Sequence, residues 1–180
     1  DLYERGKVPA EPAPPKEDFS EAVKLYDEII RRFKRFRFRD VAMYMKGYTL
    51  YRSGFEREAK TAWMALATTY KNSAYAAEAW MRVGEYHFDF GEWKLAEKAY
   101  LSAAKYPDSK FYTMVLYKLA WTRFQQYQYK QAIAGFKKLI GFYDAQKRLG
   151  KATALGSALR EEAIEYLARS LAEDDWDGVG

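Results

Sequence analysis

The sequence contains no cysteine, and His87 is its only histidine. Without cysteine the chain has no disulfide, no thiolate nucleophile and no thiolate ligand for zinc. A single histidine also excludes the cysteine–histidine pairs and multiple-histidine sites on which many hydrolases and zinc enzymes depend. The sequence has no glycine-rich phosphate-binding loop either. These absences predict a protein that is not an enzyme and that needs no cofactor.

Long hydrophobic runs are absent as well, since no apolar segment approaches the roughly 20 residues that a membrane-spanning helix needs. The net charge of +5 is mild for 180 residues, so it gives little support to a nucleic-acid partner. Aromatic residues, by contrast, make up 18% of the chain, with 16 Tyr, 11 Phe and 5 Trp. This exceeds what one core of this size requires, so we expect some aromatic rings on the surface.

A short pattern recurs along the chain: an alanine followed four residues later by a large aromatic residue. The alanines at 22, 59, 96 and 132 are 37, 37 and 36 residues apart, and their aromatic partners are Tyr26, Trp63, Tyr100 and Phe136. A small residue precedes three of these alanines at a constant distance, namely Gly47, Gly84 and Ala120. A period of this length indicates internal structural repeats.

Each repeat has the hydrophobic periodicity of two helices. We expect first helices at 41–53, 77–90 and 113–126, and second helices at 18–33, 55–71, 92–106 and 128–143. The small residues of the first helices would let the second helix of each pair approach closely. A further helix is expected near the C-terminus, at 159–175.

Residues 78–107 resemble the tetratricopeptide repeat. The matching positions are Trp80, Val83, Gly84, Gly91, Ala96, Tyr100, Ala103 and Pro107, with His87 where the family has tyrosine. Residues 43–66 and 116–140 match at fewer positions. The resemblance spans about residues 18–143 and implies an all-α fold, a right-handed α-solenoid of antiparallel helix pairs.

The repeats predict one continuous helical domain over residues 18–175. Its units are expected at about 18–37, 38–74, 75–110 and 111–145, followed by a C-terminal helix at 157–175. Residues 1–17 contain all but one of the prolines in their second half and are expected to form a linker or arm. Residues 176–180 would be an acidic, glycine-containing tail.

The family resemblance implies a peptide-binding groove lined by the first helices. Carried over by repeat position, the expected groove residues are Tyr44, Tyr48, Tyr51, Arg52, Met81, Arg82, Glu85, Asp89, Tyr117, Lys118, Trp121 and Gln125. Tyr44 and Tyr48 replace the Lys and Asn with which a chaperone-binding subclass holds a terminal carboxylate, which disfavours that subclass. The groove is expected to take apolar and aromatic side chains, with Arg52, Arg82 and Lys118 binding carboxylates. The alternative is that rings such as Tyr44 and Trp121 only pack between helices.

The segment RRFKRFRFR, residues 31–39, combines three phenylalanines with six cations: Arg31, Arg32, Lys34, Arg35, Arg37 and Arg39. By repeat position Phe33, Phe36 and Phe38 are expected to be structural and to mark the junction between two units. The first cations would meet the negative end of a helix dipole. The remaining charge leaves open an acidic partner or an anionic lipid surface.

One acidic segment, EDDWDG at 173–178, imitates the start of a calcium-binding loop through Glu173, Asp175 and Asp177. The simpler explanation is a frayed acidic terminus, so no metal site is expected. His87 is expected to be packed between helices rather than catalytic.

We therefore expect a non-catalytic adaptor or scaffold that binds a peptide or a partner surface in an aromatic groove. The alternative is a structural spacer or oligomerisation segment of a larger assembly, with the proline-rich arm in its own groove. Binding of RNA or an anionic membrane through residues 31–39 is the least favoured reading. The aromatic-rich repeats also resemble those of large bacterial cell-envelope proteins, which favours the periplasm or outer membrane over the cytoplasm and leaves the oligomeric state open.

Overall fold

The computed structural model describes the backbone of residues 19–177 and the side chains of residues 19–174. This part of the chain consists of helices joined by short connections and contains no strand. The helices are α1 (Ser20–Arg32), α2 (Arg39–Arg52), α3 (Glu56–Thr69), α4 (Ala76–Asp89), α5 (Trp93–Ala103), α6 (Tyr112–Gln125), α7 (Tyr129–Arg148) and α8 (Ala154–Asp177).

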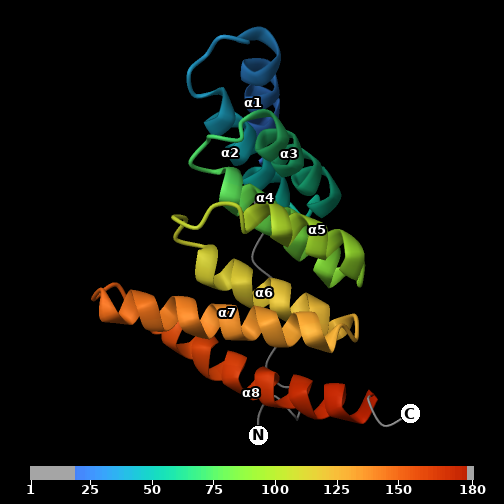
Figure 1. The fold of residues 1–180 in the computed structure, drawn as a ribbon. Helices are drawn as coiled ribbons and strands as arrows, with labels where there is room; N and C mark the ends of the chain where they lie inside the picture. The colour runs from blue at the N-terminus through green and yellow to red at the C-terminus, as the bar shows by residue number, and fades with distance from the viewer. Residues whose placement is uncertain (1–18, 178–180) are drawn as a thin grey trace, which may run out of the picture.

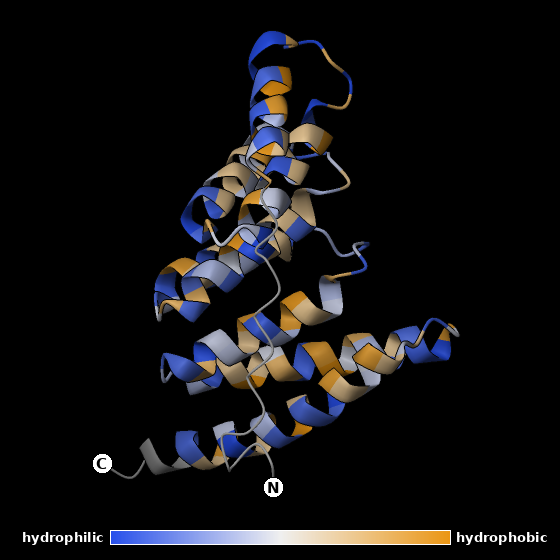
Figure 2. Ribbon diagram, turned by 180° about the vertical axis from the view of Figure 1, so that it is seen from behind, coloured by the Kyte–Doolittle hydropathy of each residue, from blue (hydrophilic) through white to orange (hydrophobic). Residues whose placement is uncertain are grey.

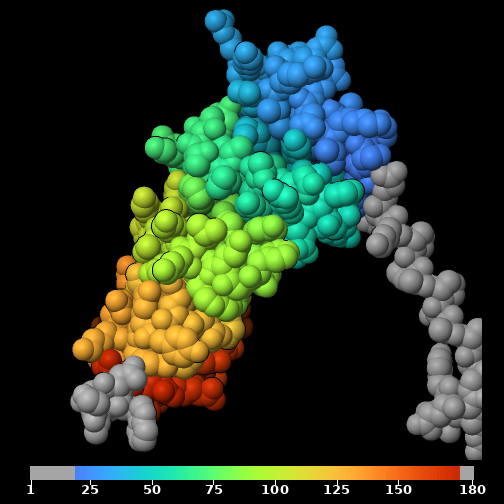
Figure 3. Space-filling model, turned by 90° about the vertical axis from the view of Figure 1, so that its right-hand side faces the viewer, coloured from blue at the N-terminus to red at the C-terminus, as the bar shows by residue number. Residues whose placement is uncertain are grey.

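The helices follow one another along an elongated solenoid (Figure 1). Three antiparallel pairs form its centre: α2 with α3, α4 with α5, and α6 with α7. Helix α1 packs on α2 at one end, and α8 packs on α7 at the other end (Figures 1 and 3). The expected all-α solenoid of helix pairs is therefore confirmed. None of the described helices is both long enough and apolar enough to cross a membrane.

A close crossing between the two helices holds each pair together. A Cβ atom added to Gly84 of α4 would lie 2.5 Å from a ring carbon of Tyr100 on α5. Gly47 of α2 stands in the same relation to Trp63 of α3, whose indole nitrogen donates to the Tyr44 carbonyl at 3.3 Å. The aromatic ring thus occupies the volume that a side chain on the first helix would take.

The turn from the first to the second helix of a pair needs a left-handed residue. Gly54 and Gly91 supply it with φ of 81° and 69°. In the third pair the same position is Tyr127, which adopts φ of 60° although such backbone is unfavourable for a residue with a side chain. The three turns therefore share one backbone geometry, although only two of them have glycine at this position.

The apolar residues of the helices meet between neighbouring pairs and form a core that continues along the solenoid. Figure 2 shows apolar and polar segments alternating along each helix, as expected for helices with one buried side. The aromatic residues of the repeats, Trp63, Tyr100 and Phe136, are all buried. Helix α1 has no buried residue, and among the described helices it packs mainly against α2.

The connection between α7 and α8 is shorter than the sequence suggested. Helix α7 continues to Arg148 and α8 already begins at Ala154. Most of residues 144–158, which separate the two helices expected from the sequence, is therefore helical. Tyr143 is buried in this region, and Asp144 pairs with Arg160 of α8 at 2.8 Å. These contacts extend α7 beyond the length of the other second helices. The expected arm at 1–17 lies outside the described residues, and the division into units remains a prediction.

The packing predicts opposite effects for two substitutions of the same kind. Gly84→Ala should destabilise the protein by about 1–3 kcal/mol, since its Cβ would collide with the Tyr100 ring. Gly141→Ala, in helix α7 with no atom within 4 Å of the new Cβ, should instead stabilise it by about 0.5–1 kcal/mol. Chemical denaturation of the two variants measures both effects. Equal free energies of unfolding would contradict the crossing described here.

Candidate partner-binding site on the first-helix face

The first helices α2, α4 and α6 lie side by side in successive pairs, and we call the surface that they form the first-helix face. A pocket of about 210 Å³ opens on it, between the ends of these helices and the start of α3. We call it the Arg82 pocket. Its lining residues are Tyr51, Glu56, Trp63, Arg82, Glu85, Tyr86, Asp89 and Lys118. Five of these eight residues were expected from repeat position alone.

Arg82 lies in the middle of α4, with carboxylates on both sides of it. Its guanidinium pairs with Glu78 at 3.4 Å and with Glu85 at 3.2 Å. Both partners are on the same helix, at spacings of four and three residues, which places them on the same side as Arg82. The positive charge of Arg82 is therefore already compensated within the protein.

Glu85 is the least solvated acid of the pocket. Burial raises the pKa of the Glu85 carboxyl, although the neighbouring Arg82 and Lys118 act in the opposite direction and Asp89 adds to the rise. Lys118 lies over the Phe88 ring, with its nitrogen 5.4 Å from the ring centroid. The ionised Glu85 carboxylate would therefore be stabilised by a further cation.

Glu56 and Asp89 are exposed at the edge of the same pocket. Among the described residues, neither forms a hydrogen bond or an ion pair. The pocket thus combines Arg82, which is paired with acids, and Lys118, which lies over a ring, with two carboxylates that have no such partner. Glu56, Trp63 and Tyr86 were not expected from the sequence. Glu56 was missed because it lies at the start of a second helix, whereas the expected residues were taken from the first helices.

Exposed aromatic rings of α2 lie beside the pocket. Tyr48 is 39% and Tyr51 is 48% exposed, and the Tyr51 ring lies 5.9 Å from that of Trp63. Arg52 is exposed next to them and donates to the Tyr48 hydroxyl at 3.4 Å. The expected residues of α2 are thus accessible, apart from Tyr44. Burial and a hydrogen bond with Glu78 raise the pKa of Tyr44, whose ring stacks on Tyr75 at 4.5 Å.

Two expected groove residues are in the core instead. Met81 is 4% exposed, and its side chain packs in the core between α4, to which it belongs, and the neighbouring helices. Tyr117 is 9% exposed, and its hydroxyl donates to Glu162 of α8 at 2.6 Å. Repeat position did not show that α8 folds against α6 and removes Tyr117 from the surface. The expectation that these two side chains line the groove is wrong.

Helix α8 also covers Trp121. The indole ring stacks on Phe88 at 4.8 Å and meets the edge of Tyr166 at 6.1 Å, and its buried nitrogen has no partner among the described residues. Gln125 lies further along α6 and borders a different hollow, beside the turn at Tyr127. The accessible part of the first-helix face is therefore formed by α2, α4 and Lys118.

Comparison with known proteins agrees with the helix pairs. Residues 114–144, which form most of α6 and α7, match the family model of the tetratricopeptide repeat. No curated protein sequence matches the chain. The family match thus covers the third helix pair, and the chain as a whole has the fold of a tetratricopeptide-repeat solenoid.

Solved structures of several other proteins superimpose on most of this solenoid. A crystal structure of MamA is 19% identical, with a TM-score of 0.54, and the match covers 98% of this chain and 94% of MamA. A chain of a T3SS complex from Aeromonas hydrophila is 17% identical, with a TM-score of 0.61 and coverage of 88% and 99%. The repeats of a Podosopora anserina kinesin light chain are 12% identical, with a TM-score of 0.54 and coverage of 99% and 92%. These similarities concern the fold, which in general serves protein interaction.

His87 occupies the place of a tyrosine in the tetratricopeptide pattern and is mostly buried, with 12% of its side chain exposed. Its Nδ1 lies 2.5 Å from a carboxylate oxygen of Glu92, so the imidazole has a polar partner. No group of potential metal ligands occurs among the described residues. The calcium hypothesis includes Asp175 and Asp177, whose side chains lie outside the described residues, so it stays untested.

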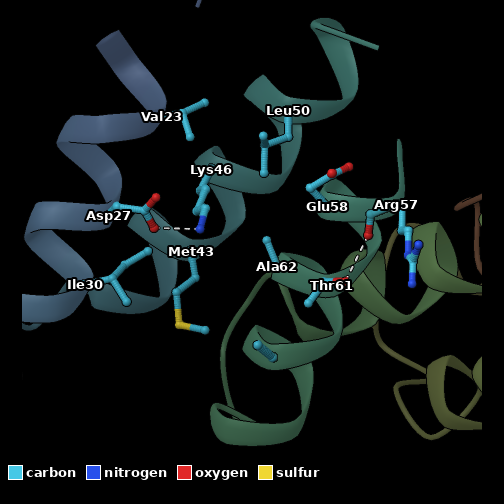
Figure 4. Close-up of a pocket in the computed structure, with 11 residues that line it drawn as sticks. Val23, Asp27, Ile30, Met43, Lys46, Leu50, Arg57, Glu58, Thr61 and Ala62 are labelled. Atoms are coloured by element: carbon cyan, nitrogen blue, oxygen red, sulfur yellow. Dashed lines mark hydrogen bonds and ion pairs between the residues drawn. The ribbon is translucent and has the colours of Figure 1, made fainter. Parts of the chain in front are cut away.

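The opposite face of the tetratricopeptide solenoid has an apolar cavity of about 620 Å³ between α1, α2 and α3 (Figure 4). Val23 and Ile30 of α1 and Met43 of α2 point into it, beside the ion pair between Asp27 and Lys46 at 2.5 Å. The next unit has Trp80 at the position of Met43, and its ring packs against the core clusters there. Sequence reasoning did not anticipate this cavity.

Residues 31–39 lie between α1 and α2, as the expected junction of two units. The expectation that their phenylalanines are structural is wrong, however. Phe33, Phe36 and Phe38 are 55%, 45% and 46% exposed. Of the six cations only Arg39 is partly buried, where it donates to the Ile30 carbonyl and the Tyr70 hydroxyl.

Removing the hydroxyl of Tyr117 and removing that of Tyr100 should change the free energy of unfolding differently. Tyr117→Phe should lower the free energy of unfolding by about 1 kcal/mol, because it breaks the bond to Glu162. Tyr100→Phe should cause no loss or a slight gain, because the Tyr100 hydroxyl is buried without a partner among the described residues. Urea denaturation of both variants provides the comparison. A larger loss for Tyr100→Phe would show that its hydroxyl is bonded in solution.

Proposed function

We propose that this chain is a protein-interaction scaffold that holds a partner's peptide on the first-helix face and takes a basic side chain of that peptide into the Arg82 pocket. The general part of this proposal, an interaction scaffold, agrees with the tetratricopeptide fold. The pocket and the charge of the partner are specific to this chain.

The observation that carries the proposal is the imbalance between paired and unpaired charges. Arg82 is held by Glu78 and Glu85, whereas Glu56 and Asp89 have no partner among the described residues. An incoming cation would find two free carboxylates beside the poorly solvated Glu85. Complementary charge of this kind fixes register and favours one class of partner over others.

The aromatic rings complete a binding site for arginine or lysine. Tyr51 and Trp63 form one side of the pocket, and a cation over such rings gains about 0.5–2 kcal/mol. Tyr48 extends the apolar surface along α2 for neighbouring side chains of the peptide. Aromatic anchors next to a charged pocket are typical of the residues that dominate binding energy.

This assignment reverses one part of the expectation from the sequence, in which Arg82 and Lys118 would bind carboxylates of the partner. An acidic side chain would have to displace Glu85 from Arg82 and approach Asp89, which repels it. The proposed peptide is therefore basic at the pocket.

A library of randomised peptides presented to the purified full chain tests this function. We expect the retained peptides to be enriched in arginine or lysine at one position, flanked by aromatic or aliphatic residues. The double variant Glu56→Gln with Asp89→Asn should bind a selected peptide with about thirtyfold lower affinity, the cost of losing roughly 2 kcal/mol.

A matched variant controls for charge and helix stability. Glu58→Gln with Asp108→Asn removes the same charges, and Glu58 belongs to the first turn of α3 as Glu56 does. This control should bind the selected peptide like the original protein. Enrichment of acidic peptides, or equal losses in the two double variants, would refute the proposal.

A further inference from the structure

The connection between α1 and α2 follows the same backbone course as the two later connections between helix pairs. The amide of Phe36 donates to the Phe33 carbonyl, and that of Arg39 donates to the Phe36 carbonyl. The same two bonds recur through Ser73 in the second connection and through Ser109 in the third. Phe36 therefore takes the place that serine has in the other two units.

Serine has a local role at this place. The hydroxyls of Ser73 and Ser109 accept from the amides of Tyr75 and Phe111, each at 3.2 Å, and so stabilise the start of the next helix. Phe36 cannot accept this bond, and its ring is 45% exposed instead. Phe36 thus lacks the hydrogen bond that this turn favours and gains no place in the core. Such a residue is expected on a surface that serves a function.

The cations of this connection have few partners inside the protein. No acidic residue occurs between Arg31 and Arg39. Arg32 pairs with Glu28, and Arg37 lies over the Phe38 ring at 4.2 Å. Among the described residues, Arg31, Lys34 and Arg35 have no hydrogen-bonding or ionic partner.

The segment lies at the end of the solenoid opposite α8 (Figures 1 and 3), and Phe36, Arg37 and Phe38 are in contact there through the Phe38 ring. Phe33, Phe36 and Phe38 are all about half exposed and alternate with exposed cations along the chain. Exposed phenylalanines next to lysine and arginine suit the boundary of a lipid bilayer, where rings enter the headgroup region and cations meet phosphates.

We propose that residues 31–38 attach this protein to an anionic lipid bilayer, with Phe33, Phe36 and Phe38 in the headgroup region and the surrounding cations on lipid phosphates. The site is separate from the Arg82 pocket, which is lined by other residues. Failure of one proposal therefore leaves the other intact.

The ring geometry favours lipid over single-stranded nucleic acid. Bases bind such proteins by stacking on open aromatic faces. Arg37 covers one face of Phe38, and the Phe36 ring meets Phe38 edge-on, with centroids 5.7 Å apart and planes at 77°. Insertion into a headgroup region needs no free ring face.

Sedimentation of the full chain with vesicles tests the attachment. We expect binding to phosphatidylcholine vesicles that contain phosphatidylglycerol and none to phosphatidylcholine alone. The triple variant Lys34→Gln, Arg35→Gln and Arg37→Gln should bind more weakly by about tenfold or more, since each cation near an anionic surface contributes. Phe36→Ser should weaken binding severalfold at low and at high salt, because its effect is not electrostatic.

The control removes the same charge from the later connections, through Lys71→Gln, Lys105→Gln and Lys110→Gln. It should retain most of the vesicle binding. Phe36→Ser should keep its thermal melting temperature, since serine suits this turn in the other units. The proposal is overturned if anionic vesicles do not bind, if neutral vesicles bind equally, or if the control loses as much as the loop variant. Binding of a single-stranded RNA oligonucleotide without vesicle binding would overturn it too.

Discussion

The close crossing of the two helices in each pair is the constraint on which the rest of the structure depends. Where Gly47 and Gly84 meet Trp63 and Tyr100, the absence of a side chain on one helix lets the aromatic ring of the other lie against its backbone. Each crossing fixes the rotation of a first helix about its axis. Repeated along the chain, it turns the same side of α2, α4 and α6 toward the first-helix face. Residues distant in sequence, such as Tyr51 and Lys118, reach one pocket for this reason.

The two proposed binding surfaces differ in charge and in their relation to the repeat. The Arg82 pocket lies within the stack, and its central cation, Arg82, is bound to acids of the same protein, which leaves Glu56 and Asp89 for a partner. Residues 31–38 lie at the end of the described stack, where Phe33 is exposed and Arg32 is the one cation among them that pairs with a described acid. A basic peptide and an anionic bilayer could therefore be held by one molecule at the same time. The solenoid would then position a partner relative to a lipid surface.

The regular spacing of Ala59, Ala96 and Ala132 indicated the repeats, and the resemblance to the tetratricopeptide repeat implied their fold, because a repeat imposes the same packing on each unit. Repeat position also placed Tyr51, Arg82 and Glu85 on one surface. It failed for Tyr117, since burial there depends on how α8 folds back, and the sequence of α8 has no counterpart among the pairs. It could not reveal that Arg82 is already neutralised, because that depends on side-chain geometry within α4. Repeat position likewise did not predict that Phe36 is exposed, because the other units have serine at this place.

The central claim is that the carboxylates of the Arg82 pocket, the exposed Glu56 and Asp89 and the poorly solvated Glu85, bind a cationic side chain. The most direct test is the pH dependence of the affinity for an arginine-containing peptide, measured by calorimetry. Burial raises the pKa of Glu85 in the free protein, and a bound cation would lower it, so binding should release a proton. The affinity should then increase as the pH rises from the usual pKa of a glutamate through the raised pKa of Glu85. In Glu85→Gln this increase should shrink. An affinity that falls over the same range, or an unchanged pH profile in Glu85→Gln, would contradict the account.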